Sequence, residues 1–168
     1  SGPSNDKRDG AFPQVRWVVA AEAGTGALIE ATIGAYTVGE QTLAKDLLAA
    51  FTAEMLVLAD RNFLSHTLAR DTLATGAHIL WRASASFALR PTRVLPDGTY
   101  LAQLRPARKG DGPPITVRVI EYTVHSTPID PATGEGDPAG GVRSEVFALV
   151  TDLLEVEAYP ALDLARAY

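Results

Sequence analysis

The stretch Met55-Leu56-Val57-Leu58-Ala59-Asp60-Arg61-Asn62-Phe63 decides how the fold of this chain is interpreted. Its apolar residues favour a buried strand, and a helical pattern begins a few residues after the aspartate. Open α/β sheets bind ligands at the carboxyl ends of their strands, which is where Asp60 would lie. Magnesium is a hard cation that prefers oxygen donors. Asp60 is therefore a candidate metal ligand, and an aspartate that starts a helix or a turn is the simpler alternative.

Two strands and a helix are predicted before this stretch. Residues 15–22 and 27–33 are rich in branched and apolar side chains, and the short glycine-rich loop at 24–26 predicts an antiparallel hairpin. That loop precedes a strand and lacks the rest of a phosphate-binding motif, so we expect a turn. Thr37-Val38-Gly39-Glu40 has the form of a capping box, which predicts a helix running to about Thr52.

The elements after Asp60 are first helical and then mainly β. A second helix is predicted from about Phe63 to Ala74, and a strand from His78 to Arg82. Short strands follow on both sides of an Asp97-Gly98 turn, at 115–124 and at 145–154. A final helix is expected to open at Tyr159-Pro160. Trp17 and Trp81 alternate with apolar neighbours, so both are predicted to lie in the core.

The order of elements predicts an α/β fold with a mixed sheet, and it resembles the later part of a ribonuclease-H-like fold. We divide the chain into a polar segment at 1–10, a partial core at 11–83, a β-rich insertion at 84–155 and the start of a last helix at 156–168. Residues 126–141 are rich in Pro, Gly, Asp and Thr, which predicts a mobile surface loop within the insertion.

The composition excludes several classes of function. The chain has no cysteine, which excludes disulfides, thiolate catalysis and cysteine-zinc sites. No apolar run approaches the roughly 18 residues that a membrane span needs. The three histidines are dispersed, without metal-binding spacing. A hydrolase of small substrates ranks last, because the sequence shows no nucleophile paired with a base.

The charge is distributed unevenly along the chain. Residues 61–118 carry nine basic and three acidic side chains, although the whole chain has a net charge of −5. A basic middle region within an acidic chain favours nucleic acid as a partner, and scattered surface arginine is the alternative. The candidate contacts to the DNA backbone are Arg61, Arg82, Arg90, Arg93, Arg105, Arg108 and Lys109.

Several strings, in order, resemble one family over most of the chain. They include Phe12-Pro13-Gln14, the stretch that ends in Asp60, Leu95-Pro96-Asp97-Gly98-Thr99-Tyr100-Leu101, and Tyr159-Pro160-Ala161 with Tyr168. From about residue 11 to 168 the chain resembles the DDE transposases of bacterial insertion sequences, specifically insertion-sequence family four.

The resemblance implies that Asp60 and Tyr168 belong to the catalytic motifs of the family and that the other catalytic carboxylates are absent from this chain. In that family two aspartates and a glutamate bind the two magnesium ions that support DNA cleavage and joining. Asp60 matches the second aspartate, and Tyr168 matches the tyrosine that opens the signature of the glutamate. In that family the first aspartate belongs to an Asp-Gly-Thr string upstream of the Phe-Pro-Gln motif. Asp9 is too close to Phe12 to match it, and Asp97-Gly98-Thr99 has the same three residues but lies in the insertion.

The resemblance therefore implies an internal fragment of a DNA transposase, which we expect to be inactive alone. It also implies that the first, central strand of the sheet is absent, so the isolated chain should fold poorly or pair with another chain. The implied partners are DNA at transposon ends and target, and a second copy in the intact enzyme, in the bacterial cytoplasm at the nucleoid. The alternative function is a non-catalytic remnant or module that binds DNA or protein.

Overall fold

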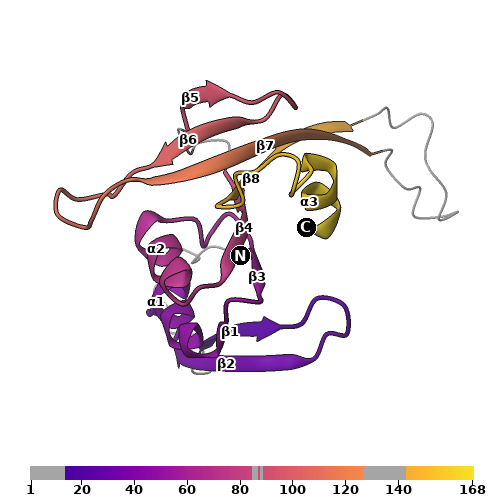
Figure 1. Cartoon of the computed structure of the whole chain (residues 1–168). Coiled ribbons are helices and arrows are strands. Elements are labelled where there is room, and N and C mark those ends of the chain that lie inside the picture. Colours follow the sequence, from indigo (N-terminus) through magenta and orange to yellow (C-terminus); the bar gives the residue numbers. More distant parts are fainter. Residues whose placement is uncertain (1–13, 85–86, 88, 127–142) are drawn as a thin grey trace, which may run out of the picture. The chain divides into compact units, whose positions relative to one another are not determined.

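The computed structural model describes residues 14–84, 87, 89–126 and 143–168 (Figure 1). The chain divides into two compact units, of which the first comprises residues 1–50 and the second residues 51–168. The predicted polar segment at 1–10 and nearly all of the predicted loop at 126–141 lie outside the described residues.

The first unit is a hairpin packed against a short helix. Strands β1 (Val15–Ala21) and β2 (Leu28–Ala35) pair antiparallel, which confirms the predicted hairpin. Helix α1 (Glu40–Ala44) continues as the 3₁₀ helix η1 (Lys45–Ala50). A Cβ added at Gly34 would lie 2.6 Å from Cδ2 of Leu43, so the absence of a side chain lets α1 approach β2 closely.

Three sequence predictions in this unit are wrong. The helix changes to the tighter 3₁₀ form at Lys45 and ends at Ala50, whereas the prediction extended it to Thr52. Its N-cap is Gly39, which has no side chain to cap the helix, and Thr37 lies two residues too early to do so. Trp17 is 62% exposed, because it lies on the strand face opposite to its buried neighbour Val18.

The second unit begins with a strand, a helix and a parallel strand: β3 (Leu56–Ala59), α2 (His66–Ala74) and β4 (His78–Ala83). Helix α2 begins three residues later than predicted, since Phe63 belongs to a turn in which its backbone N–H donates to the Asp60 carbonyl at 2.9 Å. Ser65 then caps the helix, because its hydroxyl accepts a hydrogen bond from the backbone N–H of Leu68 at 3.4 Å.

The remaining strands extend the same sheet. They are β5 (Pro91–Val94), β6 (Tyr100–Leu104), β7 (Ile115–Ser126) and β8 (Arg143–Thr151), and the six-stranded order is β3-β4-β8-β7-β6-β5. Only the β3–β4 pair is parallel among these described strands, so the predicted α/β class with a mixed sheet is confirmed. The predicted boundary at residues 83 and 84 directly follows β4, and strands on both sides of it belong to one sheet.

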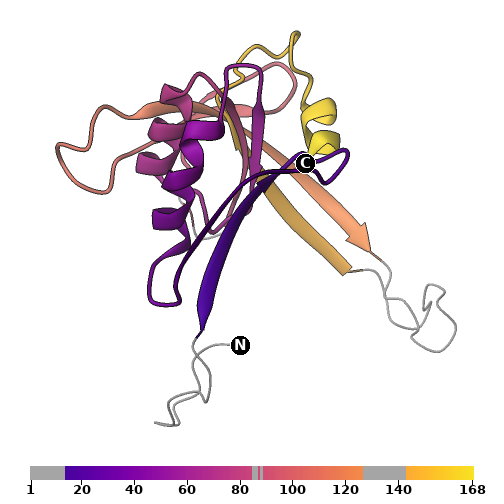
Figure 2. The same cartoon turned by 90° about the horizontal axis from the view of Figure 1, so that it is seen from below.

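Two helices cover opposite faces of this sheet, as Figures 1 and 2 show for α2 and α3 (Ala161–Ala167) beside β3 and β4. Leu164 of α3 packs into a buried cluster with Leu80, Ile120, Leu149 and Leu153. Trp81 is 1% exposed, as predicted, and it alternates with Leu80 along β4, so it faces the α2 side. The core of this unit therefore lies in two layers, one on each face.

Candidate functional site

Asp60 lies immediately after β3, and the parallel strand β4 continues two residues beyond the register partner of Ala59. The register pairs Ala59 with Trp81, so Asp60, the residue after β3, lies level with Arg82 of β4. Asp60 is exposed, and its backbone carbonyl closes the turn to Phe63. The structure therefore places Asp60 directly after a strand, as predicted, and also at the start of a turn, which was the simpler alternative.

The carboxylate of Asp60 is not used by the described part of the chain. Among the described residues it accepts no hydrogen bond and forms no ion pair. Because the side chain is exposed, water satisfies its lone pairs in the free protein. Asp60 is therefore free to bind a ligand from solution.

Tyr168 lies beside Asp60 although the two residues are far apart in the sequence. Its hydroxyl donates a hydrogen bond to the backbone carbonyl of Ala59, with 3.4 Å between the oxygens. Partial burial raises the pKa of the Tyr168 phenol, and the negative charge of Asp60 raises it further. Tyr168 is therefore held beside Asp60, the predicted metal ligand.

The position of Tyr168 follows from the packing of α3. Pro160 occupies the N-cap, where its missing N–H costs nothing. Leu164 then anchors the helix to the sheet through its contacts with Leu80 and Ile120. Because this helix is only two turns long, its anchored middle directs its end to the edge at which β3 stops.

Arg82, a predicted DNA contact, lies in the same place but is engaged within the protein. Its guanidinium forms an ion pair with Glu145 at 2.7 Å, and it stacks on the ring of Phe147 with 4.0 Å to the ring centroid. Phe147 in turn stacks on Tyr122, with 5.5 Å between the ring centroids. The positive charge of Arg82 also acts on the Tyr168 phenol, where it lowers the pKa and so opposes the effect of Asp60.

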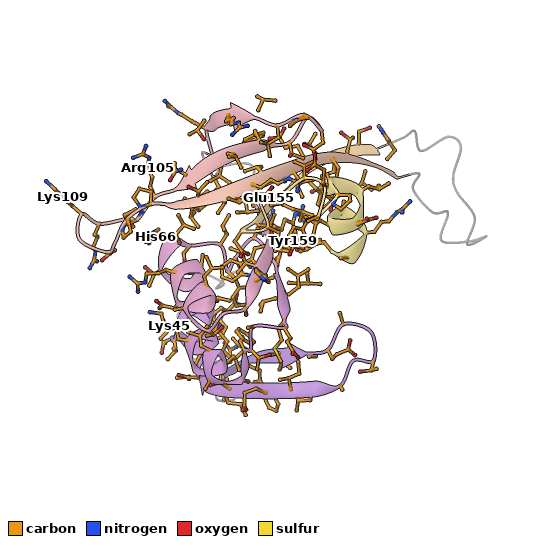
Figure 3. The ribbon with its side chains drawn as sticks, in the orientation of Figure 1. Lys45, His66, Arg105, Lys109, Glu155 and Tyr159 are labelled. Atoms are coloured by element: carbon orange, nitrogen blue, oxygen red, sulfur yellow. The ribbon has the colours of Figure 1, made fainter. Side chains whose placement is uncertain are left out.

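The other predicted DNA contacts fall into two groups. Arg90 and Arg105 line one pocket beside β5 and β6. The remaining four are exposed and form no ion pair with the described residues; they are Arg61, Arg93, Arg108 and Lys109. Figure 3 shows Lys109 at the outer end of the loop between β6 and β7. The structure thus brings only part of the predicted set together.

The sequence analysis missed a buried polar cluster around Arg118. Arg118 is 0% exposed, and its guanidinium donates to Asp97 Oδ2 at 2.6 Å, to Thr99 Oγ1 at 2.9 Å and to the Tyr159 carbonyl at 2.7 Å. These bonds hold the turn after β5 and the start of α3 to the sheet. An arginine on an otherwise apolar stretch of β7, flanked by Val117 and Val119, was the available signal.

Asp97 belongs to this cluster and so has a structural role. Burial by itself raises the pKa of its carboxyl, but hydrogen bonds from Thr99 and the charge of Arg118 outweigh burial and bring the pKa below its ordinary value. The string Asp97-Gly98-Thr99 has the same residues as the motif of the first aspartate in the resembling family. In this structure these residues form a turn, and Asp97 and Thr99 accept hydrogen bonds from Arg118.

The glycine-rich loop at 24–26 is a turn, as predicted. The carboxylate of Glu22 accepts hydrogen bonds from the backbone N–H groups of Gly24 at 2.8 Å and Thr25 at 2.6 Å. Hydrogen bonding from Thr25 and then Gly24 lowers the pKa of Glu22. These amides, which could have bound a phosphate, therefore bind a side chain of the same hairpin.

The described residues do not by themselves fit a two-magnesium site. Within the ranges that the structure describes, no three histidine or acidic side chains lie close enough together to hold a metal ion. Asp60 offers one carboxylate, and magnesium gives up its hydration reluctantly, so one such ligand binds it weakly. A metal centre at Asp60 requires ligands from outside the described residues.

Comparison with protein-family models gives no match for this sequence, and comparison with curated protein sequences gives none either. Among the described residues, no helix is both long and apolar enough to cross a bilayer.

Proposed function

We propose that this chain is part of an enzyme that cleaves and joins DNA strands with the help of metal ions, as its resemblance to the DDE transposases of insertion-sequence family four implies. Asp60 is the metal ligand that this chain contributes. The observation that carries the proposal is the Asp60 carboxylate, which has no partner among the described residues and lies at the end of β3 beside Tyr168. The proposed fold is ribonuclease-H-like, and the proposed location is the bacterial cytoplasm at the nucleoid.

The free edge of β3 supports a ribonuclease-H-like sheet that extends beyond the described strands. Among the described residues β3 pairs with β4 alone, so it is an edge strand. Its sequence, Leu-Val-Leu-Ala, has no charge, proline or bulge, which are the usual protections of an edge. A continuous apolar run is typical of an interior parallel strand. We infer that another strand pairs with β3 in the functional protein.

The magnesium ions of the intact enzyme would supply Lewis-acid chemistry at the phosphate that is attacked. Asp60 would contribute one oxygen ligand, and the remaining ligands would come from outside the described residues. The exposed basic side chains of the second unit would bind the DNA backbone, which gives affinity without reading the base sequence. A second copy would join the intact enzyme.

The test is strand cleavage by the complete protein that carries this chain. Asp60→Asn should lower cleavage by about 100-fold or more, since a metal ligand contributes several kcal/mol to transition-state stabilisation. Binding of DNA by the same variant should be unchanged. Glu54→Gln is the matched control, because Glu54 is also exposed and lies at the opposite end of β3. Cleavage that persists in Asp60→Asn would refute the proposal.

A non-catalytic module that binds DNA is the second candidate. The observation in its favour is the group of exposed basic residues at β5 and at the loop after β6, for which the described residues provide no acidic partner. In such a module Asp60→Asn changes neither cleavage nor binding, whereas substitutions of the basic residues weaken DNA binding. The same set of variants therefore separates the two candidates.

A further inference from the structure

An open pocket of about 400 Å³ lies on the second unit beside β5 and β6, and four of its six described lining residues are exposed. Its lining residues are Phe87, Arg90, Pro91, Thr92, Gln103 and Arg105. Arg90 directly precedes β5 and Arg105, labelled in Figure 3, directly follows β6. Because these strands are antiparallel, the start of β5 lies beside the end of β6, and both arginines line the pocket.

The charges of this pocket are not balanced by the described residues. Arg90 and Arg105 are both exposed, and neither forms a hydrogen bond or an ion pair within the described ranges. No acidic residue is among the described residues that line the pocket. Two like charges in one pocket repel each other, and an anion that bridges them removes this repulsion. Guanidinium groups bind phosphate through paired, charge-assisted hydrogen bonds, so phosphate fits this part of the pocket.

The remaining lining residues could contact a ligand that is larger than a simple anion. Phe87 is half-buried and offers an aromatic ring, and Pro91 offers a second apolar surface. Gln103 is oriented by the hydrogen bond from its Nε2 to Thr116 Oγ1 at 2.9 Å, and Thr92 by the bond from its hydroxyl to the Leu101 carbonyl at 3.0 Å. The amide oxygen of Gln103 remains available to accept a hydrogen bond from a ligand.

We propose that this pocket binds a nucleoside phosphate, with the phosphate against Arg90 and Arg105 and the base against Phe87. Stacking on an aromatic ring is available to every base, so the pocket tolerates different sequences. The same chemistry is offered by a free nucleotide and by an unpaired nucleotide of a DNA strand. The proposal deepens the proposed function by naming the part of the nucleic acid that this face binds. Asp60 does not line the pocket, so the two proposals are tested separately.

The experiment measures binding by the complete protein to four probes: deoxyadenosine monophosphate, inorganic phosphate, a single-stranded oligonucleotide and its duplex. Arg90→Ala and Arg105→Ala should each weaken binding of the monophosphate and the single strand about tenfold, the loss expected for one charge-assisted contact. Phe87→Leu should weaken binding of the monophosphate about fivefold or more through lost stacking, and leave inorganic phosphate unchanged. Arg93→Ala is the control for the monophosphate, because Arg93 is exposed on the same strand but does not line the pocket.

Two outcomes overturn the proposal. If Arg93→Ala weakens binding of the monophosphate as much as Arg90→Ala does, the affinity comes from overall charge. If inorganic phosphate binds as tightly as the monophosphate and Phe87→Leu has no effect, no base is recognised. Two outcomes support the proposal. If the single strand binds more tightly than the monophosphate, the natural ligand is an unpaired nucleotide of DNA. If only the monophosphate binds, the natural ligand is a free nucleotide. Asp60→Asn should leave all four affinities unchanged, so a failure of the cleavage test leaves this result intact.

Discussion

Asp60 and Asp97 belong to the same unit, and their side chains have opposite surroundings. Asp97 carries the letters of a catalytic motif, yet its carboxylate is bound to Arg118 and Thr99. Asp60 is one acidic residue at the end of an apolar run, yet its carboxylate has no partner among the described residues. The comparison teaches that the bonding partners of a carboxylate indicate its role better than the sequence motif around it does. Three substitutions, followed in four measurements, test this difference.

The largest effect should come from Arg118→Ala. This change leaves the Tyr159 carbonyl and the Asp97 carboxylate without their buried partner, and removal of one member of a buried ion pair costs about 3–5 kcal/mol. Chemical denaturation of the complete protein measures the free energy of unfolding. Arg93→Ala, on the exposed strand β5, should have almost no effect. A loss below about 1 kcal/mol for Arg118→Ala would mean that the cluster does not stabilise the fold.

A smaller loss, of about 1–3 kcal/mol, is expected for Asp97→Asn at neutral pH, because a charged hydrogen bond to Arg118 is replaced by a neutral one. The pKa of Asp97 is lowered in the folded state, so its contribution is present above the unfolded pKa and is lost as the pH falls through the folded pKa. The difference between wild type and variant should therefore shrink below about pH 4. A difference that stays constant down to acid pH would contradict the ion pair.

Asp60→Asn should lower the pKa of Tyr168, because the negative charge that disfavours the tyrosinate is removed. Burial is the larger cause of the raised pKa and remains, so the pKa should still lie above its ordinary value. NMR titration of carbon-labelled tyrosine resolves Tyr168 from the other tyrosines. Glu54→Gln serves as the control at the far end of β3. An unchanged Tyr168 in Asp60→Asn would show that the two residues are not neighbours.

The smallest effect should be that of Asp60→Asn on stability. An exposed carboxylate without a structural partner contributes little, so the free energy of unfolding should change by less than about 0.5 kcal/mol. Measured beside Asp97→Asn under the same conditions, this result completes the contrast between the two aspartates. A loss as large as that of Asp97→Asn would assign Asp60 to the structure and remove the reason to consider it a metal ligand.

Much of the local structure could be predicted from residue patterns. The hairpin, the strand that ends at Asp60 and the strands on both sides of the Asp97-Gly98 turn all follow from alternation and turn residues, which act over a few positions. The errors occur where tertiary contacts compete with such patterns. Trp17 alternates correctly, but alternation does not say which face of the hairpin is covered. Helix α2 starts later than predicted because Ser65 caps it.

The sequence by itself determined the α/β class, the position of Asp60 at the end of a strand, the basic middle region and the exclusion of cysteine chemistry. Only the tertiary structure decided which polar side chains meet. Tyr168 reaches Ala59 across 109 residues, and Arg118 reaches Asp97 across 21. Arg90 and Arg105 share a pocket because β5 and β6 pair antiparallel. Strand order and register determine these contacts. Both depend on the packing of the whole sheet and not on the short-range preferences that a sequence pattern reports.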